Sequence, residues 1–246
     1  MRIKLTLFAD EPIQLDFSYP LQLRALIYHL LPDEYAEFLH DSGFQYEKRS
    51  FKLFTFSRIF GKRLHGNRNG KPLVFKNVIH FYLGSPVSKI LEYVANESLK
   101  RNDLRFGANR VFLKAIEVEN EPIFTEKVKI KMLSPMTIRS TLLTGEGKKK
   151  SYYYNPHESE FSELMRRNLE KKYSLVYKQP LDGQLQIKPI GRNKERILRG
   201  DRGFIIKAWD GFYELTGTPE LIQLSYSTGL GEKNSQGLGM WVEVKK

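Results

Sequence analysis

The sequence predicts an α+β protein made of two consecutive domains, of which the second is the less regular. The chain has 246 residues, which is enough for two domains of roughly 100 to 125 residues that each bury a core. Hydrophobic residues make up 41% and charged residues 28% of the chain, which excludes the composition typical of disorder. Segments typical of strands and helices occur in both halves, and the boundary between domains is expected at residues 120–122.

The first strand and the first two helices are predicted from hydrophobic periodicity and from residues that end helices. Residues 2–8 alternate between apolar and polar side chains, a pattern typical of a strand. Residues 21–31 are rich in Leu, Ala and Ile, and Pro32 ends the predicted helix. A short second helix is expected over residues 34–41, because Gly43 follows it as a stop.

The remaining elements of the first half are two strands, a helix and a final strand. Residues 51–57 and 73–84 are rich in aromatic and β-branched residues, and a glycine-rich basic stretch separates them. A helical segment over 87–100 and strand material over 111–118 follow. The order is β-α-β-β-α-β, the ferredoxin-like arrangement, which is expected for a domain of residues 1–120.

A second ferredoxin-like domain is expected over residues 121–246. One helix is predicted in this half, and a second helix is weak or missing. No sequence repeat relates the two halves, so the duplication is inferred from the order of elements alone. The expected elements are a strand at 124–133, a helix at 159–177, strands near 183–190 and 203–215, and a final strand at 239–245.

The charge of the chain favours a polyanionic partner. Lys and Arg total 40 and Asp and Glu total 28, which leaves a net charge of +12. Phosphate contacts release condensed counterions, so nucleic acid or an acidic membrane surface is the expected class of partner. No apolar run approaches the roughly 20 residues that span a bilayer, and the first residues include acids where a signal peptide is apolar. A cytoplasmic protein that does not enter the membrane is therefore expected.

The chain contains no Cys, which excludes disulfides, a catalytic thiol and thiolate zinc sites. A metal ion would have to be bound by His and carboxylate groups, and the His residues stand in no ligand-spaced pair. Glu34, Glu37 and Asp41 share a face of the second predicted helix, where Mg²⁺ could gather, but a solvated charged face is the favoured interpretation. We therefore expect no metal site and no cofactor.

The most specific local feature is the segment TGLGEKNSQGLGMW, directly before the last predicted strand. Its glycines indicate unusual backbone angles or the close approach of a ligand. Amides of such a loop can hold phosphate oxygens, and a flexible hairpin loop is the alternative interpretation. The segment lacks the GxxxxGK[ST] pattern of nucleotide-binding loops. The residues expected to contact a phosphate-containing ligand are Gly231, Lys233, Asn234, Ser235 and Gln236.

The segment GLGEKNSQGLGMWVEV resembles the C-terminal signature of the CRISPR-associated endoribonucleases that process precursor CRISPR RNA, a family of the wider repeat-associated RNA-binding superfamily. Further similarities occur at ALIYHLL, FLHDSGF, FKLFTFS and MLSPMTI, in the family's order and approximate spacing. Together they span most of the chain. The resemblance implies tandem ferredoxin-like domains that bind RNA against the cleft and faces between them.

Cleavage of RNA without a metal ion needs a base for the 2′-hydroxyl, an acid for the leaving 5′-oxygen and a cation for the charged transition state. By the resemblance, Tyr28, His40 and Lys52 fall at the family's catalytic positions as base, acid and electrostatic stabiliser. A helix C-terminus at His40 would favour the imidazolium that an acid needs. Tyr28 fits its role least well, because a phenol has a pKa of about 10, and positioning of the 2′-hydroxyl is its alternative role. Without the resemblance, all three residues have ordinary structural explanations.

Three basic regions are candidates for holding the RNA. Residues 58–71 include no acid and are expected to form a loop that follows phosphates, through Arg58, Lys62, Arg63, Arg68 and Lys71. Residues 188–202 are favoured for contact in the second domain, through Lys188, Arg192, Lys194, Arg196, Arg199 and Arg202. The segment KKKSYYY combines Lys for phosphates with Tyr for base stacking, and an exposed loop is its alternative interpretation.

The favoured function is a metal-independent endoribonuclease that cuts CRISPR repeat RNA and leaves a 2′,3′-cyclic phosphate and a 5′-hydroxyl. The alternative is a catalytically silent subunit that binds repeat RNA in an effector complex with other CRISPR-associated proteins. The presence of Tyr28, His40 and Lys52 favours the enzyme. A membrane-surface or general nucleic-acid-binding protein would explain the charge but not the ordered motifs.

Overall fold

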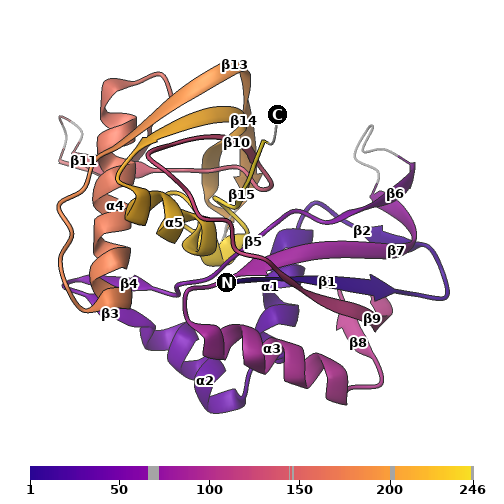
Figure 1. The fold of residues 1–246 in the computed structure, drawn as a ribbon. Helices are drawn as coiled ribbons and strands as arrows, with labels where there is room; N and C mark the ends of the chain where they lie inside the picture. Colours follow the sequence, from indigo (N-terminus) through magenta and orange to yellow (C-terminus); the bar gives the residue numbers. More distant parts are fainter. Residues whose placement is uncertain (66–71, 144, 146, 200–202, 245–246) are drawn as a thin grey trace. The chain divides into compact units, whose positions relative to one another are not determined.

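The computed structural model describes residues 1–65, 72–143, 145, 147–199 and 203–244, which form helices and antiparallel sheets (Figure 1). The chain divides into two compact units, each with its own buried core. Unit 1 comprises Met1–Glu121 and Ser235–Gly237, and unit 2 comprises Pro122–Asn234 and Leu238–Lys246. The basic residues Arg68, Lys71 and Arg202 lie outside the described residues.

Unit 1 is built on an antiparallel sheet around β1 (Arg2–Phe8). β1 pairs with β7 (Leu73–Gly84) on one side and with β9 (Asn109–Glu119) on the other. Alternate side chains of β1 enter the core, as the period of two in the sequence predicts. The shorter strands add to the edges: β2 (Ile13–Leu15), β5 (Thr55–Phe56) and β6 (Phe60–His65) pair with β7, and β8 (Leu104–Phe106) pairs with β9.

Helices α1 (Tyr19–His29) and α3 (Ser88–Lys100) supply apolar residues to the core of unit 1. In α3, for example, Ile90 and Val94 lie one turn apart and are fully buried. A compact segment follows α1 and carries the first candidate residues. It consists of α2 (Asp33–Glu37), a π-helical turn (Phe38–Ser42), β3 (Phe44–Tyr46) and β4 (Arg49–Phe51).

Unit 2 contains a four-stranded antiparallel sheet in the order β13-β14-β10-β15. In β10 the apolar side chains are buried and the three Lys side chains are exposed, so the alternating sequence KVKIKM gives this strand one core face. Helices α4 and α5 pack apolar residues into the same core. The elements are β10 (Lys127–Met132), β11 (Arg139–Leu143), β12 (Lys149–Tyr153), α4 (Ser159–Tyr177), β13 (Leu185–Arg199), β14 (Ile205–Gly217), α5 (Pro219–Thr228), a 3₁₀ turn (Asn234–Gln236) and β15 (Trp241–Glu243).

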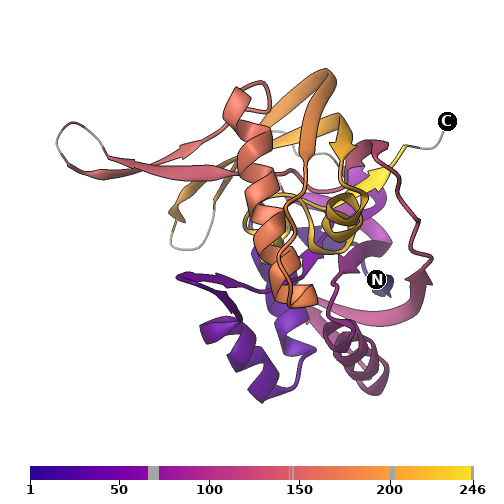
Figure 2. The same cartoon turned by 60° about the vertical axis from the view of Figure 1, so that its left-hand side comes forward.

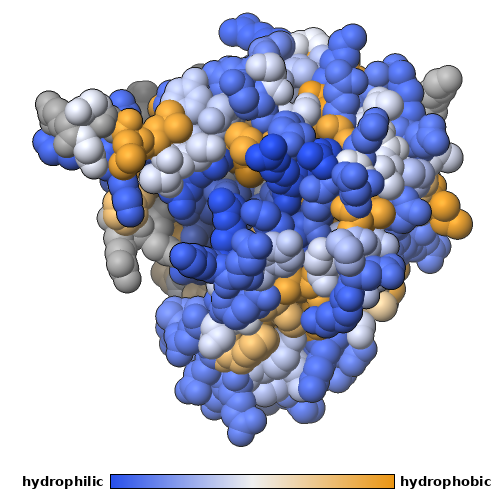
Figure 3. Space-filling model, turned by 90° about the vertical axis from the view of Figure 1, so that its left-hand side faces the viewer, coloured by the Kyte–Doolittle hydropathy of each residue, from blue (hydrophilic) through white to orange (hydrophobic). Residues whose placement is uncertain are grey.

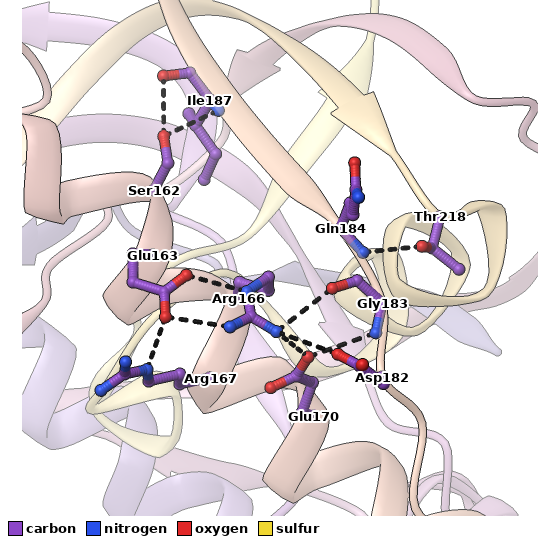
Figure 4. A network of polar contacts seen from close by, with 10 residues as sticks. All are labelled: Ser162, Glu163, Arg166, Arg167, Glu170, Asp182, Gly183, Gln184, Ile187 and Thr218. Atoms are coloured by element: carbon purple, nitrogen blue, oxygen red, sulfur yellow. Dashed lines mark hydrogen bonds and ion pairs between the residues drawn. The ribbon is translucent and has the colours of Figure 1, made fainter.

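Polar contacts fix α4 to the segment that leads into β13 (Figure 4). Arg166 pairs with Glu163 and Glu170 on its own helix and donates to the carbonyl oxygen of Gly183 at 3.2 Å. The Arg166 hydrogen bond holds the pKa of Glu163 at about 2. The backbone N–H of Ile187 donates to the hydroxyl of Ser162 at 3.0 Å, which ties β13 to α4.

Two expectations from the sequence are wrong. The second helix of the second half is present as α5, although it contains β-branched and polar residues that favour helices weakly. Burial of its side chains supplies the stability that its composition lacks, since seven of its residues are buried. The strand expected at 51–57 is interrupted, because Leu53 adopts a positive φ of 53° between β4 and β5.

Candidate functional site

His40 lies in an exposed turn of unit 1. After α2 the chain widens into the π-helical turn, in which Leu39 is buried while the side chain of His40 is 78% exposed. Such turns are rare and often occur at functional sites. The turn ends at Gly43, where φ is 61° and an added Cβ would lie 2.6 Å from the carbonyl oxygen of Phe51. Only glycine fits this position, so the shape of the turn is built into the sequence.

Lys52 lies against this turn, one residue after β4. Its Nζ donates to the carbonyl oxygen of His40 at 2.9 Å, while Nδ1 of His40 lies 2.7 Å from Oδ1 of Asp41. Burial lowers the pKa of the Lys52 ammonium, and the charge of Asp41 opposes this effect. The structure therefore brings together a histidine, a carboxylate and an amine within a few residues.

Tyr28 lies on α1 and is half-buried against the core of unit 1. Its ring meets the buried ring of Phe54 edge-on, with 6.0 Å between the ring centres. Phe54 follows Lys52 by two residues, so Tyr28 packs on the segment that carries Lys52. The catalytic roles of the three residues stay predictions.

The glycine-rich segment forms a folded loop rather than an extended hairpin tip. Its four glycines all have positive φ, between 74° and 85°. The loop is anchored in unit 2, because the N–H of Glu232 donates to Thr137 O, that of Leu230 to Gly239 O, and that of Gly239 to Pro135 O, each at 2.9 Å. Among the predicted contact residues, Gly231 and Asn234 are buried, while Lys233, Ser235 and Gln236 are partly exposed.

The predicted basic contacts lie on strands. Lys62 and Arg63 are exposed on β6, and Arg58 is partly buried just before it. On β13, Arg192, Lys194 and Arg199 are exposed, as is Lys188. Arg196 lies 3.4 Å from the carboxylate of Asp210, so part of its charge is already neutralised. Sequence reasoning therefore located exposed cations, but expected a loop where β6 lies.

The segment KKKSYYY contributes to a two-stranded hairpin of β11 and β12, which forms a sheet of its own and projects from the rest of unit 2 (Figure 2). Lys148, Lys149 and Lys150 are exposed, and so is Leu143 on the opposite strand. Hydrophilic residues cover most of the face drawn in Figure 3, and hydrophobic ones show on the projecting hairpin. At its base, Arg139 lies 3.4 Å from Glu232 of the glycine-rich loop. The hairpin thus begins beside the loop and carries positive charge away from it.

Two classes of feature were searched across the described residues. No group of three or more His, Cys, Asp or Glu side chains is arranged there to hold a metal ion, and this includes the face with Glu34, Glu37 and Asp41. In the same part of the chain, no helix is long and apolar enough to cross a membrane.

Two family models match consecutive parts of the chain. The model for CRISPR-associated protein Cas6, N-terminal, matches residues 13–117, and the model for CRISPR associated protein Cas6, C-terminal, matches residues 118–243. The chain belongs to the Cas6 family. The resemblance noted in the sequence is confirmed at this level.

Individual Cas6 proteins are similar over nearly the full length. CRISPR-associated endoribonuclease Cas6 1 of Methanocaldococcus jannaschii is 28% identical, over 100% of this chain and 93% of its own. CRISPR-associated endoribonuclease Cas6 of Pyrococcus furiosus is 29% identical, over 94% and 84% respectively. A solved structure named CRISPR associated protein Cas6 has a TM-score of 0.81 at 27% identity, covering 100% of this chain and 99% of its own. The mixed α+β fold with antiparallel sheets is therefore the fold of known Cas6 structures.

Sequence reasoning missed Lys172, which underlies the glycine-rich loop of this Cas6 chain. Its side chain is buried, and Nζ donates to three oxygen atoms of the loop. A helical plot of α4 would have found it, because Lys172 falls on the same stripe as the buried residues Phe161, Met165 and Leu169. A lysine on an apolar stripe signals a buried polar contact.

Proposed function

We propose that this Cas6 family chain is a metal-independent endoribonuclease that cuts precursor CRISPR RNA within its repeats. The contact between Lys52 Nζ and the carbonyl oxygen of His40 carries the proposal, because it holds an amine beside an exposed imidazole. The names of the similar proteins, which are CRISPR-associated endoribonucleases, support the same reaction class.

The reaction begins with attack of a ribose 2′-hydroxyl on the adjacent phosphorus atom. A 2′,3′-cyclic phosphate forms, the bond to the 5′-oxygen of the next nucleotide breaks, and that oxygen takes up a proton. His40 is assigned as the acid that donates this proton. Asp41 engages Nδ1, which leaves the assignment of the transferred proton to Nε2 and fixes the orientation of the ring.

Lys52 is assigned to stabilise the negative charge that develops on the phosphate oxygens, a role in which position matters as much as charge. Its bond to the His40 backbone couples the two groups, so that a shift of one shifts the other. Tyr28 is assigned to receive the proton of the 2′-hydroxyl or to position that hydroxyl. Its packing against Phe54 suits positioning, because a half-buried ring has a fixed orientation.

The RNA backbone is proposed to contact the exposed cations of β6 and β13, the glycine-rich loop and the β11–β12 hairpin. Phosphate contacts of this kind give affinity that falls with salt. The named residues are Arg58, Lys62, Arg63, Arg192, Lys194, Arg196, Arg199, Gly231, Lys233, Asn234, Ser235 and Gln236, with Lys148, Lys149 and Lys150 on the hairpin.

Both units are assigned to the ferredoxin-like fold, with unit 1 carrying the catalytic residues. The supporting observation is the order of the principal strands. It is β6-β7-β1-β9 in unit 1 and β13-β14-β10-β15 in unit 2, so the second, third, first and fourth strands of the motif stand side by side in each.

The assignment of His40 is tested by single-turnover cleavage of a labelled repeat RNA in EDTA. His40→Ala should slow cleavage by about 100- to 10,000-fold, the usual contribution of a general acid, without weakening RNA binding. His29→Ala is the matched control, since it removes another exposed histidine of unit 1 and should cut at the wild-type rate. Wild-type cleavage by His40→Ala would remove His40 from the acid role.

The alternative is a silent subunit that binds repeat RNA in an effector complex with other CRISPR-associated proteins. The exposed cations fit this function as well, because binding needs no catalytic group. Tight, salt-sensitive binding of repeat RNA without cleavage under any condition would select the alternative.

A further inference from the structure

Lys172 makes an unusual set of contacts for a lysine. Its side chain extends from α4 into the interior of unit 2, and the residue is only 2% exposed. Nζ donates to Gly229 O at 2.9 Å, to Gly231 O at 2.9 Å and to Oδ1 of Asn234 at 2.8 Å. All three acceptors belong to the glycine-rich loop, so one side chain from α4 spans the base of that loop.

Asn234 extends this contact within the loop. Its Nδ2 donates to Leu230 O at 3.1 Å and to Leu238 O at 3.0 Å, while its Oδ1 accepts from Lys172. The amide thus joins the two sides of the loop. Its polar atoms are engaged inside unit 2, which assigns Asn234 a structural part in the loop rather than a direct contact with RNA.

The two side chains fix the direction of the loop's carbonyl groups. In a trans peptide the N–H of the next residue points opposite to the carbonyl, so a carbonyl held by Lys172 turns that N–H away from it. The N–H of Leu230 and that of Glu232 follow two such carbonyls, and they donate to Gly239 O and Thr137 O. The base of the loop is therefore fastened on both sides, and its apex is the segment 233–237.

Burial of an amine brings little net stability, because desolvation offsets the hydrogen bonds that the amine makes. A fully bonded polar network does specify one conformation, since any other arrangement leaves buried oxygens without donors. Positive φ at Gly229 and Gly231 lets these carbonyls turn toward the amine. The glycines and Lys172 are thus two parts of one device.

We propose that Lys172 is a positioning residue for RNA binding, whose amino group holds the base of the glycine-rich loop so that Lys233, Ser235 and Gln236 are presented to the repeat RNA. This inference rests on the proposed function, because it takes the loop to be an RNA contact. Lys172 itself does not touch the RNA and acts through the loop backbone.

The test compares Lys172→Met with Lys171→Met, which removes a positive charge from the preceding residue of the same helix. The ligand is a labelled repeat RNA with a 2′-deoxy sugar at the cut, so that binding is measured without cleavage. Lys172→Met should weaken binding at least tenfold and speed hydrogen exchange at the amides of Leu230, Glu232 and Gly239. Lys171→Met should change the affinity by less than threefold and leave these amides as in the wild type.

A second variant keeps the test decisive if Lys172→Met does not fold. Asn234→Ala removes one acceptor of Lys172 and both loop contacts of the amide, and it should weaken binding and speed exchange at the same amides. Because both residues act through one network, the double variant should bind about as weakly as the weaker single variant, whereas independent sites would add.

Wild-type affinity in Lys172→Met, or in Asn234→Ala where the first does not fold, overturns the inference and leaves the proposed function standing. Equal losses in Lys172→Met and Lys171→Met also overturn it, because the loss would then follow from charge alone. Failure of the wild-type protein to bind repeat RNA is a different result and overturns the proposed function together with the inference.

Discussion

Replacement of Gly231 by alanine should destabilise unit 2 strongly. Gly231 has φ of 74°, and an added Cβ would lie 2.1 Å from the carbonyl oxygen of Thr137. That oxygen cannot move freely, because it accepts the N–H of Glu232 at 2.9 Å. Left-handed backbone costs alanine about 1 to 2 kcal/mol, overpacking about 1 to 3, and the disturbed hydrogen bond about 1, while the stiffer unfolded chain returns about 0.4 to 1. The net loss of unfolding free energy is about 2 to 5 kcal/mol.

Fluorescence during urea unfolding measures this loss, because the chain has 2 Trp residues and both, Trp209 and Trp241, are buried in unit 2. Gly191→Ala is the matched control. Its φ is 64°, but among the described residues no heavy atom lies within 4 Å of the added Cβ. The control should cost only about 0 to 1.5 kcal/mol, the backbone penalty less the unfolded-state gain. Equal shifts of the unfolding midpoint in the two variants would refute the argument from close contact.

Three further outcomes follow from the described contacts. Lys52→Met should slow repeat cleavage by about 100- to 1,000-fold in single-turnover assays, as loss of a transition-state donor does, and a change below threefold would contradict its role. Replacing Lys148, Lys149 and Lys150 together with Gln should make the slope of log K against log salt shallower by about 0.7 for each lost phosphate contact on single-stranded RNA, whereas the same change at the exposed Lys76, Lys100 and Lys114 of unit 1 should leave it unaltered. Burial lowers the pKa of Lys172 from 10.5 to about 7, so the folded chain binds fewer protons than the unfolded chain between these values, and the destabilisation present below pH 7 is relieved as pH rises toward 10.5. Unfolding midpoints should therefore rise with pH in the wild type relative to Lys172→Met, and a difference that does not vary between pH 7 and 10 would show that Lys172 does not titrate there.

Elements with a strong local pattern could be predicted from the sequence with accurate bounds. The strand expected at 73–84 and the helix expected at 159–177 have these bounds in β7 and α4. Both contain long stretches in which periodicity and composition agree. Helix α5 could not be predicted in the same way, because its stability comes from burial against the sheet of unit 2 and not from its own residues.

The candidate site shows the same division. Motif resemblance located His40 and Lys52, but their contact depends on a π-helical turn and on a positive φ at Leu53, which no periodicity indicates. The part played by Asn234 was also hidden. A polar residue in a glycine-rich segment looks like a ligand contact in the sequence, whereas its amide is used inside the fold.

The central claim is that the chain cuts RNA by attack of a 2′-hydroxyl. The most direct measurement is to incubate the wild-type protein with end-labelled repeat RNA in EDTA and to identify the ends of the products, beside the same RNA with a single 2′-deoxy sugar at the cut. The account predicts one cut per repeat, a 2′,3′-cyclic phosphate and a 5′-hydroxyl, and no cut in the 2′-deoxy RNA. Cleavage of the 2′-deoxy RNA, or activity that appears only when Mg²⁺ is added, would contradict it.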